Sequence, residues 1–119
     1  MTPTDTGPFQ GMVDSVKTIP GVTGTVVVAH DGVVIAHEIS GNPEKEGAVA
    51  VYVGHAAARI GQSLSLSPLR WAVVGIGQET VMVIEQRDCY VGLFLDERAS
   101  PAMVAARALS ALGQSEGST

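Results

Sequence analysis

Three histidines are the first residues of this sequence that could do chemistry, because imidazole is a common ligand of metal ions. If a two-residue hairpin turn forms at 31–32, His30 faces Val33 and His37 faces Val26 on the paired strand. The two histidines then belong to cross-strand pairs that are four residues apart along the strands. That spacing separates them by roughly 13 Å at ~3.3 Å per residue, so they cannot share one ion. His55 has no histidine or carboxylate at the spacing of a zinc pair. The sequence therefore predicts no metal site and no cofactor.

Groups that could act as nucleophiles or acids occur without the neighbours that such chemistry needs. Cys89 begins an apolar run with no base marked beside it, which favours a packed or surface thiol. The stretch G-I-G-Q-E-T (75–80) joins two predicted strands and opens no helix, so it is not a nucleotide fingerprint, and no P-loop motif is present. Asp96 and Glu97 are best explained as a solvated loop. We expect a protein that is not an enzyme.

Composition limits the classes of partner. A net charge of −5 argues against nucleic acid and against an electrostatic hold on anionic lipid. No apolar run approaches the length of a membrane span, and the first residues lack the features of a secretory signal. The single cysteine excludes an internal disulfide and favours a reducing cytoplasm. Apolar residues make up 45% of the 119-residue chain, which favours association with a partner over a bare monomer.

The elements that must position these residues follow from local patterns. Asp31-Gly32 between two β-branched runs predicts a hairpin with a two-residue type I′ turn. Asn42 and Pro43 predict the start of a long helix, and Gly113 predicts the end of the last one. The predicted helices cover 8–19, 43–64 and 100–113, and the predicted strands cover 23–30, 33–39, 71–76, 81–85 and 89–95. One domain is expected over 8–113, with disordered tails at 1–7 and 114–119.

Every predicted strand carries apolar residues at both parities, so both faces of the sheet must be covered. With three helices available, the sequence predicts an α+β fold in which helices sandwich a five-stranded antiparallel sheet. The order of elements is αββαβββα.

The long middle helix is apolar nearly all the way round. Its larger apolar side chains form one stripe at helical spacing, from Val49 to Ile60. Very small residues form a second stripe, which includes Gly54 and Gly61. Glycine in a helix interior costs roughly 1 kcal/mol relative to alanine, so a packing reason is expected. Close approach of a symmetry-related helix is one explanation, and tight packing on the sheet within one monomer is the other.

Beyond these patterns, the chain resembles the Roadblock (dynein light chain Roadblock-type) family, and within it the bacterial MglB-like proteins. The segment P-G-V-T-G-T-V-V-V-A-H-D-G-V-V-I-A (20–36), the small-residue helix at 43–64 and the V-V-G-I-G-Q-E-T-V-M-V-I-E meander (73–85) carry the resemblance. It covers about 9 to 113. It implies a Roadblock/profilin-like sheet in the order 2-1-5-4-3, and a homodimer through the third strand and the middle helix.

The resemblance also implies a function. Roadblock proteins are non-catalytic platforms for small Ras-like GTPases, and MglB-like members are GTPase-activating proteins for the polarity GTPase MglA. The alternative is a structural adaptor that joins other Roadblock subunits or signalling proteins without affecting GTP hydrolysis.

Two sets of residues are assigned on this basis, and no arginine is assigned a catalytic role. The predicted dimer interface consists of Val49, Ala50, Val53, Gly54, Ala57, Ala58, Gly61, Trp71 and Val73. The predicted partner-binding residues are His55, Arg59, Gln62 and Arg70.

Overall fold

The order of helices and strands is the one that the sequence predicts. The computed structural model describes residues 7–64 and 70–117. The elements are α1 (Gly7–Val16), β1 (Val22–Ala29), β2 (Val34–Glu38), α2 (Pro43–Ser63), β3 (Trp71–Ile76), β4 (Glu79–Glu85), β5 (Cys89–Leu95) and α3 (Pro101–Gly117).

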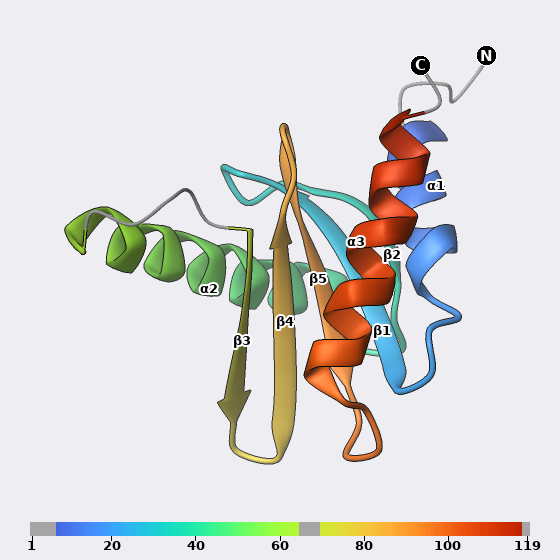
Figure 1. The fold of residues 1–119 in the computed structure, drawn as a ribbon. Helices are drawn as coiled ribbons and strands as arrows, with labels where there is room; N and C mark the ends of the chain where they lie inside the picture. Colours follow the sequence, from blue (N-terminus) through green and yellow to red (C-terminus); the bar gives the residue numbers. More distant parts are fainter. Residues whose placement is uncertain (1–6, 65–69, 118–119) are drawn as a thin grey trace.

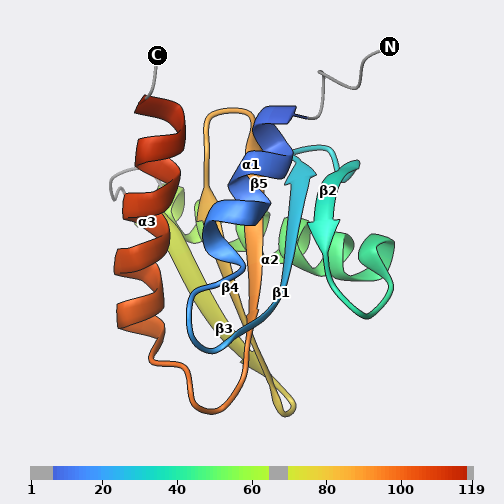
Figure 2. The ribbon, with the colours of Figure 1, turned by 90° about the vertical axis from the view of Figure 1, so that its right-hand side faces the viewer.

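The five strands form one antiparallel sheet in the order β2-β1-β5-β4-β3. α2 crosses one face of this sheet, while α1 and α3 lie side by side on the other (Figures 1 and 2). Val26 and Val28 belong to the core under α2, and Val27 belongs to the core under α1 and α3. This arrangement explains why the strands are apolar on both faces, and it confirms the predicted architecture.

The connection between β1 and β2 is longer than the predicted two-residue turn. The Gly32 N–H donates to the Ala29 carbonyl at 2.9 Å, and the Ala29 N–H donates to the Val33 carbonyl at 2.8 Å. The pairing register shifts after Val27, so Val28 faces Val34. The predicted turn length was therefore wrong because the strands meet through a bulge. The prediction that the turn needs a glycine with positive φ is confirmed, since Gly32 has φ 102°.

α2 begins as its sequence predicts. The Asn42 side chain accepts a hydrogen bond from the Glu44 N–H at 3.0 Å, and Pro43 is the first helical residue. The first N–H groups of a helix have no partner within the helix. The Asn42 side chain accepts from one of them, and Pro43 has no N–H that needs a partner.

The ends of the other two helices differ from the prediction. α1 ends at Val16 rather than near residue 19. α3 continues to Gly117, so Gly113 does not end it. The buried side chains Ala108 and Leu112 hold α3 on the core, which outweighs the ~1 kcal/mol cost of an internal glycine. The predicted tail residues 1–6 and 118–119 lie outside the described residues.

The small residues of α2 serve close packing on the chain's own sheet. A Cβ at Gly54 would lie 2.7 Å from the Tyr90 ring, and a Cβ at Gly92 on β5 would lie 3.0 Å from Ala50 Cβ. Ala50, Val53 and Gly54 are buried in this contact. The assignment of these three residues to a dimer interface was therefore wrong, because the sheet of the same chain already covers them.

We expect Gly54→Ala to lower the free energy of unfolding. The new methyl group would press on the Tyr90 ring, and overpacking of this kind costs about 1–3 kcal/mol. Urea unfolding at neutral pH measures the difference.

The matched control is Gly113→Ala in α3, where a Cβ meets no atom within 4 Å. That change should raise the free energy of unfolding by up to ~1 kcal/mol through helix propensity alone. A Gly54→Ala variant that gains stability as Gly113→Ala does would contradict the packing argument.

Candidate interaction surface

The two edges of the sheet differ in how well they are protected from pairing with another chain. β2 is short, is bulged against β1, and ends in His37 and Glu38. Bulges and charges of this kind discourage edge pairing. β3 has the sequence W-A-V-V-G-I and pairs with β4 at all six positions without a register shift. Among the described strands, β3 is therefore a regular edge strand without charged side chains, and none of them pairs with its outer edge.

α2 is longer than the sheet is wide. Its 21 residues span ~31 Å at 1.5 Å per residue. The four gaps between the five strands span ~19 Å. The helix therefore exceeds the sheet by about 12 Å, and Figure 1 shows its C-terminal part continuing past β3. This overhanging part of the helix has no strand beneath it among the described elements.

The overhang exposes side chains that point the same way as the core. Ile60 follows the buried Val53 by seven residues and Leu64 follows it by eleven, which places all three on one helix face. Yet Ile60 is 60% exposed and Leu64 is 63% exposed. We call Ala57, Ile60, Gly61 and Leu64 the overhang face. It is an apolar helix face that lacks the sheet it would normally cover.

β3 adds apolar side chains on the opposite face of the sheet. Trp71 pairs with Ile84 and Val73 pairs with Met82, and both partners belong to the core under α1 and α3. Directly paired residues lie on the same face, so Trp71 and Val73 face the α1/α3 side, and both are exposed. The β3 edge is thus apolar on both sides of the sheet.

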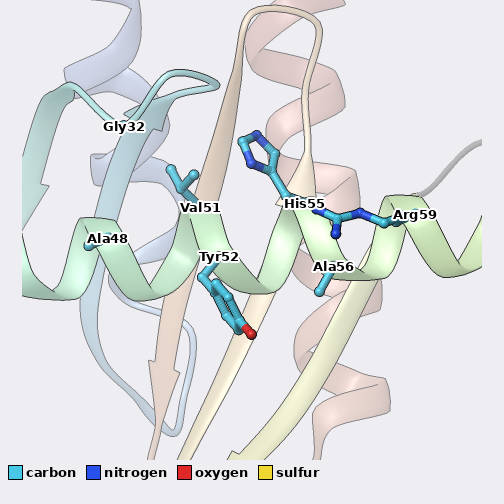
Figure 3. A pocket seen from close by; sticks show the side chains of 7 residues that line it. All are labelled: Gly32, Ala48, Val51, Tyr52, His55, Ala56 and Arg59. Atoms are coloured by element: carbon cyan, nitrogen blue, oxygen red, sulfur yellow. The ribbon is translucent and has the colours of Figure 1, made fainter.

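The predicted site residues fall into separate groups. Among the predicted interface residues that remain accessible, Ala57, Ala58 and Gly61 are half-buried in the C-terminal half of α2, and Val49 packs partly against the core. The four predicted partner-binding residues, His55, Arg59, Gln62 and Arg70, are all exposed. His55 and Arg59 line one shallow hollow on the outer side of α2 (Figure 3). Gln62 and Arg70 do not line it.

Sequence reasoning missed Ile60 and Leu64 as interface residues, although the helix length could have revealed them. A predicted helix of 22 residues over a predicted sheet of five strands must project beyond it. It also missed a cluster that no sequence spacing reveals, in which Tyr90 lies between two histidines. The Tyr90 ring centroid is 4.6 Å from that of His30 and 5.6 Å from that of His55, both edge to face.

This cluster joins the β1–β2 loop, β4, β5 and α2. His30 Nε2 lies 3.0 Å from Glu85 Oε2, an ion pair when the imidazole is protonated, although the two atoms are not aligned for a hydrogen bond. Burial, and secondly the Glu85 carboxylate, raise the pKa of Tyr90, so its phenol stays protonated at neutral pH. Tyr90 therefore packs under α2 as a neutral phenol.

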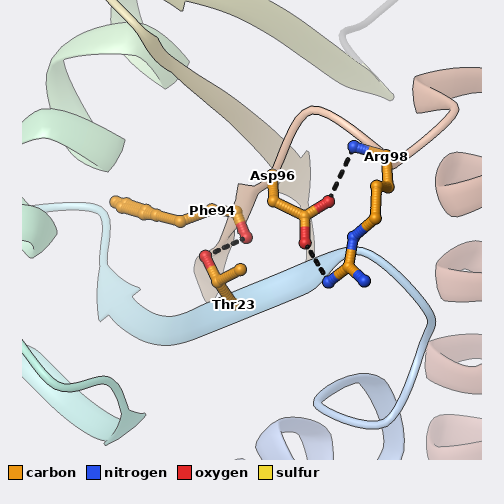
Figure 4. A network of polar contacts seen from close by, with 4 residues as sticks. All are labelled: Thr23, Phe94, Asp96 and Arg98. Carbon is orange, nitrogen blue, oxygen red and sulfur yellow. Dashed lines mark hydrogen bonds and ion pairs between the residues drawn. The ribbon is translucent and has the colours of Figure 1, made fainter.

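The carboxylate of Asp96 has a structural role at the start of α3. It accepts hydrogen bonds from the Arg98 backbone N–H and from the Arg98 guanidinium, each at 2.9 Å (Figure 4). The side-chain hydrogen bond from Arg98 is the largest cause that lowers the pKa of Asp96. The Asp96 N–H also donates to the Gly21 carbonyl at 2.9 Å. An ionised, fully engaged carboxylate fits the prediction of a loop residue rather than a general acid.

Neither a cluster of metal ligands nor a membrane-spanning helix is found within 7–64 and 70–117. No group of three or more His, Cys, Asp or Glu residues there is arranged to hold a metal ion. No helix in the same ranges combines the length and apolar character needed to cross a bilayer.

Comparison with known proteins identifies the fold. No model of a known protein family matches this chain, and no curated protein matches it by sequence. MglB from Myxococcus xanthus matches its structure with a TM-score of 0.79 at 10% identity, over 96% of this chain and 89% of that one. The Roadblock/LC7 domain from Streptomyces avermitilis matches with a TM-score of 0.75 at 15% identity, over 87% and 90%.

A further match is an MglB with a tetrameric arrangement, with a TM-score of 0.75 at 15% identity, over 90% of this chain and 86% of that one. These similarities confirm the Roadblock-type fold that the sequence resemblance implied.

We expect Asp96→Asn to lower the free energy of unfolding at neutral pH. Because the folded-state pKa of Asp96 lies below its ordinary value of 3.8, the ionised carboxylate stabilises the fold above that pH. This contribution is lost as the pH falls through the folded-state pKa. Urea unfolding of both proteins from pH 7 to acid should therefore show a difference that shrinks below pH 3.8.

Glu97→Gln is the control, since Glu97 is exposed and makes no hydrogen bond or ion pair with the described residues. A stability difference for Asp96→Asn that is independent of pH would count against the role of the charge.

Proposed function

We propose that this chain is a homodimeric, non-catalytic regulator that binds a small Ras-like, MglA-like GTPase and modulates its nucleotide cycle. The observation that carries the proposal is the α2 overhang beside the open β3 edge. The Roadblock-type fold shared with MglB proteins supports it.

Pairing of β3 with β3 of a second copy would satisfy both features at once. The sheet would continue past β3, and the partner's strands would fill the space beneath the overhang face. Ile60, Leu64 and the edge residues Trp71 and Val73 would then be covered. A two-fold axis would make the contact self-complementary, as in most homodimers.

The outer side of α2 is the proposed contact for the GTPase. It carries the exposed Tyr52, His55 and Arg59. In a dimer the α2 helices of both copies would lie on the same face of the extended sheet, which would provide one broad platform. Such a platform would regulate hydrolysis by holding the GTPase's own catalytic groups in position, with no arginine supplied by this chain.

We expect Ile60→Lys to convert the dimer to a monomer. The change places an ammonium group in a contact that is apolar in both copies, and we expect it to weaken the dimer by about a hundredfold or more. Sedimentation equilibrium at micromolar protein gives the dissociation constant.

Met103→Lys is the matched control, because Met103 is a comparably exposed apolar residue, at 55%, on α3 in the opposite layer. It should leave the dimer intact. A wild-type protein that sediments as a monomer, or an Ile60→Lys protein that keeps the wild-type mass, would overturn the proposed interface.

We expect the dimer to bind the MglA-like GTPase of its own organism selectively in the GTP-bound state and to accelerate hydrolysis. Calorimetry with the GTPase loaded with GTP analogue or with GDP measures binding, and phosphate release measures hydrolysis.

Binding without any change in hydrolysis or exchange would assign the chain to the adaptor class instead. Absence of binding in both nucleotide states would refute the GTPase proposal and leave the fold unaffected.

A further inference from the structure

A shallow hollow of about 370 Å³ lies between the β1–β2 loop and the outer side of α2. Gly32 forms its loop side, and α2 provides Ala48, Val51, Tyr52, His55, Ala56 and Arg59. Figure 3 shows the Arg59 side chain running back along the helix toward His55. The hollow therefore combines two nitrogen-bearing side chains with an apolar wall.

The charge of the hollow is opposite to that of the chain as a whole. Arg59 carries a permanent positive charge, His55 can add another, and none of the seven lining residues is acidic. The chain itself has a net charge of −5. Asp31 is the acid next to Gly32 in the sequence, and its carboxylate accepts a hydrogen bond from the Val33 N–H at 3.2 Å. It does not line the hollow.

His55 is held in place by contacts that extend back to the sheet. Its ring meets the buried Tyr90 ring edge to face, and the same Tyr90 ring meets His30. His30 in turn lies 3.0 Å from Glu85. A side chain held in this way loses less conformational entropy on binding than a free surface side chain does.

We propose that this hollow binds a carboxylate side chain, an Asp or Glu, on the surface of the partner protein. The inference rests on the proposed function, because it specifies the chemistry by which the GTPase would be recognised. The Arg59 guanidinium can donate two parallel hydrogen bonds to a carboxylate, and His55 can donate a third. Val51 and Ala56 can contact the aliphatic stem of the same side chain.

The apolar wall favours a protein carboxylate over a free anion such as phosphate. Four of the seven lining residues carry no charge and provide mostly apolar surface: Ala48, Val51, Tyr52 and Ala56. Phosphate sites usually offer several backbone N–H donors or a cluster of cations. In this hollow the Gly32 N–H is already donated to the Ala29 carbonyl.

The first test needs no GTPase. The ¹⁵N-labelled full chain is titrated with a capped pentapeptide of two glutamates and three leucines, and in parallel with the peptide in which glutamine replaces glutamate. We expect saturable amide shifts at Gly32, His55 and Ala56 with the glutamate peptide. Binding of the glutamine peptide should be about tenfold weaker or absent.

Equal shifts with both peptides, or no shift at these amides, would overturn the proposal. So would inorganic phosphate that produces the same shifts at lower concentration than the glutamate peptide.

The second test uses the MglA-like GTPase with two charge-reversed variants of the chain. Arg59→Glu should weaken binding by about tenfold or more. Arg107→Glu, on the exposed side of α3 in the opposite layer, should leave binding near the wild-type value. Wild-type binding that Arg59→Glu does not weaken would overturn this inference and leave the proposed function intact. If the wild-type chain does not bind the GTPase, the proposed function fails, and the peptide titration still decides whether the hollow binds carboxylates.

Discussion

α2 rests on the sheet mainly through three residues with one side-chain carbon or none, beside the larger Val53, and the course of the helix depends on that close contact. Gly47 lies over Val34 of β2, Ala50 lies over Gly92 of β5, and Gly54 lies over the Tyr90 ring. These residues recur three and four positions apart, as one helix face requires. The contact fixes where α2 crosses the sheet. It therefore also fixes how much of the helix remains past β3 and which side chains its outer side presents.

The overhang leaves apolar side chains exposed that the described part of the chain does not cover. An apolar helix face without a described strand beneath it leaves Ile60 and Leu64 in water, and no described strand pairs with the outer edge of β3. Apolar exposure disfavours the isolated chain by about 25 cal/mol per Å², and an open edge offers hydrogen bonds to any strand of suitable register. The β2 edge has a bulge and the charged Glu38 instead. The contrast between the two edges therefore favours β3 over β2 as the edge for the proposed dimer.

Much of the fold could be predicted because its signals are local. Gly32 in the hairpin loop, Asn42 at the start of α2 and the two-sided apolar strands each require only a few neighbouring residues. The stripe that includes Ala50 and Gly54 was ambiguous, because close approach to a sheet and close approach to a second helix select the same small side chains. Only Tyr90, 36 residues away from Gly54 in sequence, resolves that ambiguity. The prediction that Gly113 ends the last helix was wrong for a related reason. Leu112 beside it is buried and holds the helix on the core.

The proposed contacts with a second copy and with a GTPase are separable because they lie on different sides of α2. The overhang face continues the side of the helix that packs on the sheet, whereas the hollow lies on the outer side and begins a turn or more before the overhang. Tyr90 links the two through packing, because it supports α2 at Gly54 from below and contacts His55 at the rim of the hollow. A change at Tyr90 should therefore disturb both surfaces, while changes at Ile60 or Arg59 should each affect one. Packing between α2 and the sheet thus supports both proposed surfaces, while their exposed side chains can change with little effect on the fold.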